Sequence, residues 1–143
     1  MTLNTNHLLR SIQTLESSLD FLNQAEPDSI DYEVYRNAVV KGFGLILETS
    51  GKLLRKALKA YGGNPKAVDE LFYKDVFRHA AKHGLLGAEE VGRWFTYRDN
   101  RNNTAHDYGV AFANETLVLI PAFLTDAKAL ESKLRAKFED ADA

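Results

Sequence analysis

Apolar side chains recur at steps of three and four residues through almost the whole chain, and this spacing constrains the fold more than any other feature. Such steps place apolar groups on one face of an α-helix. No segment alternates apolar and polar residues between turn signals, as a half-buried strand would. We therefore predict an all-α fold. The clearest stripe comprises Leu8, Ile12, Leu15, Leu19 and Leu22.

Turn and cap residues divide the first half of this pattern. Residues 26–29 break the first helix, and the Gly62-Gly63 pair ends a second, longer one. Asn64 followed by Pro65 has the form of an N-cap and a first helical residue. On the second helix, the side chains expected to point into the core are Val39, Phe43, Ile46, Leu47, Ser50, Leu53, Leu54 and Leu58.

The second half of the sequence also predicts helices only. A helical stretch runs from residue 64 to about residue 83, with an interruption near residues 74–75 as one option, and Gly84 ends it. The next helix has Glu89 in its first turn, and Pro121 either kinks the last helix or marks its start. Four or five antiparallel helices with short connections predict one up-and-down bundle domain over residues 1–143.

Composition limits the classes of function. The 143 residues are 45% hydrophobic and 27% charged, which is a globular composition, and the absence of cysteine rules out disulfides and thiolate metal sites. The net charge of −2 does not favour a general nucleic-acid binder, so any RNA must be bound through a local patch. Because no apolar run resembles a signal peptide or approaches a membrane span, we expect a cytoplasmic protein.

Residues 98–108 concentrate polar chemistry at the end of a predicted helix. At about 100° per residue, Arg98, Asn102 and His106 form one row on the helix, and Arg101 and Tyr108 belong to the adjoining row. Histidine as acid or base, with arginine to stabilise charge, suits the handling of a phosphodiester. The alternative is a solvated polar helix end.

Three other patterns have weaker functional interpretations. Residues 75, 79 and 83 are Asp, His and His at helical spacing, which suits zinc but also a solvated helix face. A basic stripe over residues 52–59 can relieve the helix dipole or attract a phosphate backbone. The Gly42-Phe43-Gly44 segment follows no strand, so close helix packing is favoured over a dinucleotide loop.

The polar segment resembles the signature of the HEPN superfamily, Arg-x4-His, in residues 101–106. It matches the extended form with Asn102 after the arginine and His-x-Tyr at the end, which is typical of HepT-like toxins and of nucleotidyltransferase substrate-binding proteins. The likeness covers roughly residues 8–135, including Trp94 and the Glu48-x3-Lys52 pair. It departs at Gly51, where many relatives carry tryptophan.

This resemblance implies a five-helix bundle that forms a symmetric homodimer, with two copies of the motif facing one cleft. It implies a metal-independent endoribonuclease without a cofactor, in which His106 is the acid–base residue and Arg101 stabilises the phosphate. Asp99 and Asn102 would orient these groups.

The expected partners are RNA and a minimal nucleotidyltransferase antitoxin, which would transfer AMP to Tyr108, whereas neither DNA nor a membrane is expected. Two alternatives remain: a non-catalytic substrate-binding subunit of a nucleotidyltransferase, and a helical bundle without chemistry.

Overall fold

The computed structural model describes residues 2–62, 64–106 and 110–138, without the side chains of residues 104–106. Every regular element within these residues is an α-helix, which confirms the predicted all-α class. The helices are α1 (Asn6–Gln24), α2 (Ile30–Lys59), α3 (Pro65–Asp69), α4 (Tyr73–Lys82), α5 (Ala88–His106) and α6 (Val110–Phe138).

Local hydrogen bonds explain most of the helix boundaries. Ser29 Oγ accepts from the backbone N–H of Tyr32 at 3.0 Å and begins α2, and Asn64 caps α3 as predicted. Gly84 ends α4 with a φ of 77°, a backbone conformation that glycine adopts without strain. The interruption expected near residues 74–75 lies earlier, at residues 70–72, so the chain has two helices there.

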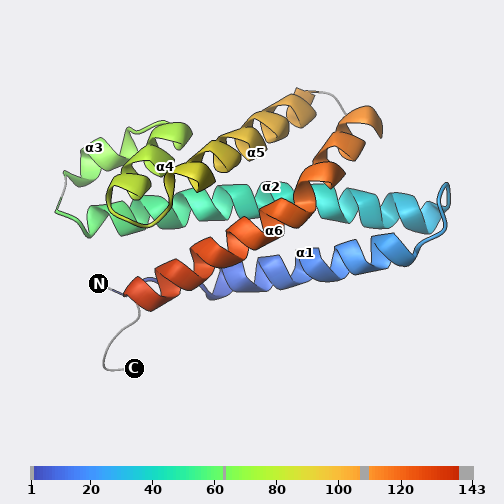
Figure 1. Cartoon of the computed structure of the whole chain (residues 1–143), viewed down its shortest axis with the longest axis horizontal. Coiled ribbons are helices and arrows are strands. Elements are labelled where there is room, and N and C mark those ends of the chain that lie inside the picture. Colours follow the sequence, from blue (N-terminus) through green and yellow to red (C-terminus); the bar gives the residue numbers. More distant parts are fainter. Residues whose placement is uncertain (1, 63, 107–109, 139–143) are drawn as a thin grey trace.

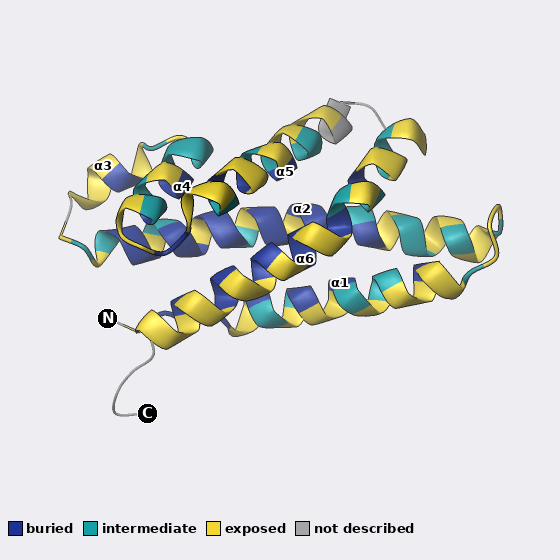
Figure 2. Cartoon of the chain, viewed as in Figure 1, coloured by how far each residue is buried: buried dark blue, intermediate teal, exposed yellow. Residues whose placement is uncertain are grey.

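The long helix α2 is the centre of the molecule (Figure 1). It packs against α1 on one side and against α4, α5 and α6 elsewhere, and α3 lies near its C-terminal end. The two ends of the described chain lie close together, because the backbone N–H of Leu3 donates to the carbonyl of Phe138. Each long helix turns a buried face inward and an exposed face outward (Figure 2).

The core has the residues that the spacing predicts. All eight inward-facing positions expected on α2 are buried. Aromatic side chains from α2, α4, α5 and α6 fill the centre, where edge-to-face pairs add to the burial of apolar area. The largest fully buried side chains are Trp94, Tyr97, Phe43, Phe77 and Phe123.

Helix α6 contains Pro121 in its interior, so the option of a late start is wrong and the kink remains. Proline cannot donate the hydrogen bond to the preceding turn, and the first turns of α6 run in a different direction from the rest of the helix (Figure 1).

Helix α6 alone among the described helices has the length and hydropathy of a membrane span, and the sequence-based expectation underestimated this. It nevertheless packs against α1, α2 and α5 and buries Asp126 and Glu131.

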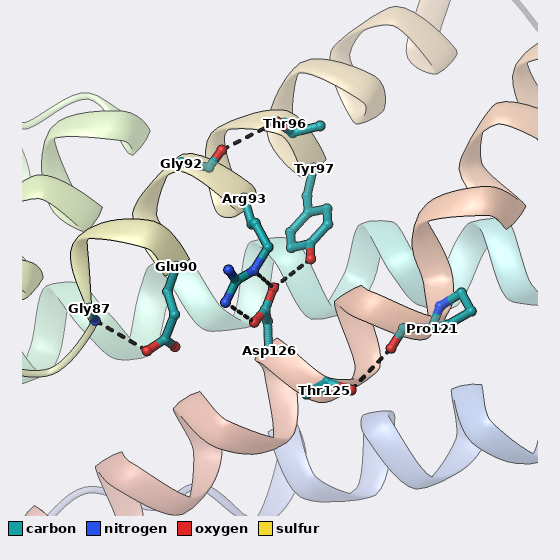
Figure 3. Close-up of polar contacts among 9 residues, drawn as sticks. All are labelled: Gly87, Glu90, Gly92, Arg93, Thr96, Tyr97, Pro121, Thr125 and Asp126. Atoms are coloured by element: carbon teal, nitrogen blue, oxygen red, sulfur yellow. Dashed lines mark hydrogen bonds and ion pairs between the residues drawn. The ribbon is translucent and has the colours of Figure 1, made fainter.

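A buried carboxylate joins α6 to α5 (Figure 3). Asp126 accepts two hydrogen bonds from the Arg93 guanidinium, at 2.8 and 2.9 Å, and a third from the Tyr97 hydroxyl at 2.5 Å. Burial, and then the bond to Asp126, raise the pKa of Tyr97 above its usual range, so the phenol remains a donor. These bonds fix the position of α5 along α6.

We predict that Asp126→Ala lowers the free energy of unfolding by about 2–3 kcal/mol in urea denaturation, because the buried Tyr97 hydroxyl loses its acceptor. Lys128→Ala is the matched control, since Lys128 also lies on α6 but pairs with Glu16 at the surface. That change should cost less than about 1 kcal/mol. Equal losses in both variants would show that the buried network does not hold α5 to α6.

Candidate functional site

Arg101, the first residue of the Arg-x4-His motif, lies directly over the backbone of α2. A Cβ atom at Gly44 would come within 2.7 Å of Arg101 Nε and 2.8 Å of its Cζ. No L side chain fits there unless the guanidinium moves. The close packing expected at residues 42–44 is therefore confirmed: Gly44 packs against the motif arginine, and a Cβ atom at Gly42 would lie 3.3 Å from Leu15 of α1.

Arg98, one turn earlier on α5, stacks on the ring of Tyr73, with its Cζ 4.5 Å from the ring centroid. The Tyr73 hydroxyl donates to the carbonyl of Leu47 at 2.8 Å, which holds the ring against α2. Burial raises the pKa of Tyr73 above its usual range, so this hydroxyl stays protonated. The aromatic ring thus sets the position of a second guanidinium near the motif.

Tyr73 also explains the departure from the family pattern at Gly51. A Cβ atom there would lie 2.8 Å from Tyr73 Cε2, and the bond to Leu47 prevents the ring from moving freely. The ring of Tyr73 therefore occupies space that a larger residue at position 51 would need. The departure therefore concerns local packing and leaves the motif itself unchanged.

The remaining polar residues of α5 are divided between neighbouring helices. Asp99 forms an ion pair with Lys74 of α4 at 2.8 Å, and Asn100 accepts a hydrogen bond from Thr116 of α6 at 2.8 Å. Asn102 is exposed. The described contacts of Asp99 and Asn100 thus join α5 to α4 and α6.

The other two predicted site residues lie largely outside the described residues. The backbone of α5 continues to His106, so positions 101 and 106 belong to one helix, but the His106 side chain is not among those described. Tyr108 lies wholly outside the described residues. The structure therefore tests the surroundings of Arg101 and leaves the histidine and tyrosine roles as predictions.

Aromatic core side chains pack against α5 on the N-terminal side of the motif. Trp94, which the resemblance to relatives singled out, is fully buried and stacks on Phe77 with ring centroids 5.1 Å apart. Tyr97 meets Phe123 edge-to-face at 5.1 Å. These rings bind α5 to α4 and α6 over the two turns that precede Arg101.

The alternative metal site gains no support. Asp75 pairs with Arg78 at 2.7 Å, and His83 stacks on Tyr61 with ring centroids 4.1 Å apart. No group of three or more histidine, aspartate or glutamate side chains within the described ranges could hold a metal ion. In these contacts both side chains have structural partners.

The basic stripe on α2 has two parts. Arg55 donates to the carbonyls of Val68 and Leu71, and Lys59 pairs with Asp69 at 2.7 Å, so these two cations hold α3 and the turn after it. Lys52 and Lys56 are exposed. Sequence reasoning alone could not separate the structural cations from the exposed ones, because all four lie on one helix.

Residues 3–136 match the family described as nucleotidyltransferase substrate binding protein like. The chain belongs to this family. A probable ribonuclease HepT of Haemophilus influenzae is 26% identical over 139 residues, which are 94% of each chain.

Two solved structures share the fold. One, from Haemophilus influenzae, is described as the substrate binding domain of a nucleotidyltransferase; it is 26% identical with a TM-score of 0.80, over 92% of this chain and 99% of that one. The other is a tri-AMPylated HEPN toxin of Shewanella oneidensis in complex with an MNT antitoxin, 15% identical with a TM-score of 0.65, over 92% and 98%. The predicted membership of the nucleotidyltransferase substrate-binding protein family is confirmed.

Proposed function

We propose that the chain is a metal-independent endoribonuclease of the HepT type, the toxin of a toxin–antitoxin pair, acting on RNA in the cytoplasm. The observation that carries this proposal is the position of Arg101 over Gly44, where the backbone of α2 leaves room for the guanidinium of the motif helix. The similarity to a protein named probable ribonuclease HepT over 94% of both chains supports it.

The proposed reaction is cleavage of RNA through its own 2′-hydroxyl. His106 removes the proton from the 2′-oxygen, which attacks phosphorus and forms a 2′,3′-cyclic phosphate. The bond from phosphorus to the 5′-oxygen breaks, and the leaving oxygen receives a proton from an acid. Arg101 stabilises the charge that develops on the phosphate oxygens. No metal ion is needed in this scheme.

We further propose that the active unit is a homodimer. The reaction needs a base and an acid, and each chain has one motif histidine. A two-fold interface contains the same surface from both subunits, so it would bring two copies of His106 and two of Arg101 together.

A dimeric active unit predicts that sedimentation equilibrium at micromolar concentration gives about twice the 16.0 kDa mass of one chain. A fully active monomer would contradict the composite site.

The second candidate function is a binding subunit that completes a nucleotidyltransferase, without catalysis. It is favoured by the structural relative described as the substrate binding domain of such an enzyme. Both candidates share the fold and a minimal nucleotidyltransferase as partner. Cleavage of RNA by the purified chain distinguishes them.

We predict that His106→Ala and Arg101→Ala each reduce cleavage of a labelled RNA by at least about 100-fold, since one variant removes proton transfer and the other removes charge stabilisation. EDTA should leave the rate of the wild-type chain unchanged. Product gels with the purified proteins measure both effects. Activity that survives His106→Ala and is lost in EDTA would overturn the mechanism.

Gly44→Ala tests the geometry without touching the motif. The new methyl group should displace the Arg101 guanidinium at little cost in stability, because the far end of a flexible side chain moves, and cleavage should fall about tenfold or more. Gly92→Ala is the matched control: it is the same substitution within a helix, on α5, and the new Cβ would meet nothing within 4 Å apart from its chain neighbours and the nearby backbone of its own helix. Its activity should equal that of the wild-type chain.

We also propose that Tyr108 accepts AMP from the nucleotidyltransferase. The phenol oxygen would attack the α-phosphorus of ATP and release pyrophosphate. The attached phosphodiester adds about one negative charge, which would compete with RNA for Arg101. The similar fold of a toxin that was solved in tri-AMPylated form supports this proposal.

Incubation with the nucleotidyltransferase and ATP should therefore add the mass of AMP to the peptide containing Tyr108 and abolish cleavage. Tyr108→Phe should prevent both changes. Inhibition that is equally strong without ATP, and leaves Tyr108 unmodified, would show that the antitoxin acts by covering the site.

A further inference from the structure

A small pocket lies next to the motif, between α2, α4 and α5. It has a volume of about 180 Å³ and is lined by Glu48, Gly51, Lys52, Arg55, Tyr73 and Arg98. The structure thus joins the Glu48-x3-Lys52 pair of α2 to Arg98 of the polar segment, although nearly fifty residues separate them in the chain. The proposed reaction uses none of these side chains.

The charges of this pocket favour an anion. Lys52, Arg55 and Arg98 contribute three cations and Glu48 contributes one carboxylate, whereas the whole chain has a net charge of −2. Arg98 is held by its contact with the Tyr73 ring, and Lys52 is exposed. The Arg55 guanidinium donates to the backbone carbonyls of Val68 and Leu71, so it contributes mainly its charge, and Lys52 and Arg98 are the other two cations that line the pocket.

The size of the pocket favours a single group over a whole nucleotide. Pockets that enclose drug-sized ligands have about 300–1,000 Å³. The pocket is also close to the motif, since Gly51 and Gly44 are seven residues apart, which is about 10 Å along a helix. Arg101 lies over Gly44 and the pocket includes Gly51, so both sites follow the same face of α2.

We propose that this pocket binds a backbone phosphate of single-stranded RNA adjacent to the phosphate held by Arg101. The proposal rests on the proposed function, because it takes RNA as the substrate. Lys52 and Arg98 bind the phosphate oxygens. The Glu48 carboxylate repels the negatively charged phosphate and so limits the affinity. The site sets where along the strand cleavage occurs, since it fixes one phosphate while Arg101 binds its neighbour.

The test measures binding of a fluorescein-labelled 2′-O-methyl RNA oligonucleotide, which lacks the attacking hydroxyl and stays intact. Anisotropy titrations over a KCl series should give a dissociation constant roughly 3- to 10-fold higher for Lys52→Gln than for the wild-type chain. The logarithm of the association constant decreases linearly with log[KCl]. The steepness of this decrease should be smaller by about 0.7 in Lys52→Gln, which is the value for one phosphate contact on a single strand.

Three variants serve as controls. Lys52→Arg retains the charge and should bind like the wild-type chain. Glu48→Gln removes the opposing carboxylate and should tighten binding about twofold, the opposite sign to Lys52→Gln. Lys133→Gln removes one exposed lysine of α6, outside the pocket, and should change neither the dissociation constant nor the slope.

The outcomes separate this proposal from the proposed function. Lys52-dependent binding of the 2′-O-methyl strand, without cleavage of ordinary RNA, supports the phosphate site and refutes the nuclease. Cleavage of ordinary RNA with wild-type binding in Lys52→Gln refutes the phosphate site alone. A Lys52→Gln chain that binds RNA normally but loses its complex with the nucleotidyltransferase would assign the pocket to that protein and overturn our proposal.

Discussion

The buried carboxylate of Asp126 is the interaction on which the position of the motif helix depends. A charged group without partners is costly inside a protein, so Asp126 constrains where Arg93 and Tyr97 can lie. Both partners are on α5, one turn apart, and they therefore determine the rotation and the height of that helix relative to α6. Arg98 and Arg101 follow on the next turns of the same helix and take their positions from this arrangement.

Backbone and aromatic surfaces contribute to the rest of the site. Arg101 lies on the bare backbone at Gly44, and Arg98 lies on the ring of Tyr73. Arg98 also lines a pocket with Lys52 and Arg55, so three cations lie together beside the motif. This concentration of positive charge agrees with the proposed handling of RNA phosphates.

Much of this architecture could be predicted from the sequence, because apolar spacing and cap residues are local signals. The inward face of α2 and the capping role of Asn64 are examples. The number of helices was harder to predict, since the break at residues 70–72 contains neither glycine nor proline.

The surroundings of the motif could not be predicted in the same way. The contact between Gly44 and Arg101 joins two helices that are distant in the chain, and helical periodicity contains no information on which glycine meets which arginine. Similarly, the pairing of Asp99 with Lys74 depends on the packing of α5 against α4. The Arg-x4-His spacing indicated the family from the sequence alone. The neighbours of each motif residue could be identified only from the three-dimensional structure.

The bare backbone at Gly44 has a consequence for surveys of related sequences. A chain that keeps both the arginine and the histidine of the motif, but has a larger residue at the position of Gly44, would retain the signature while losing the placement of its guanidinium. Degenerate copies of such genes could therefore be recognised from a position far outside the motif. A reliable sequence signature for this family would combine the Gly44 position of α2 with the Arg-x4-His motif of α5.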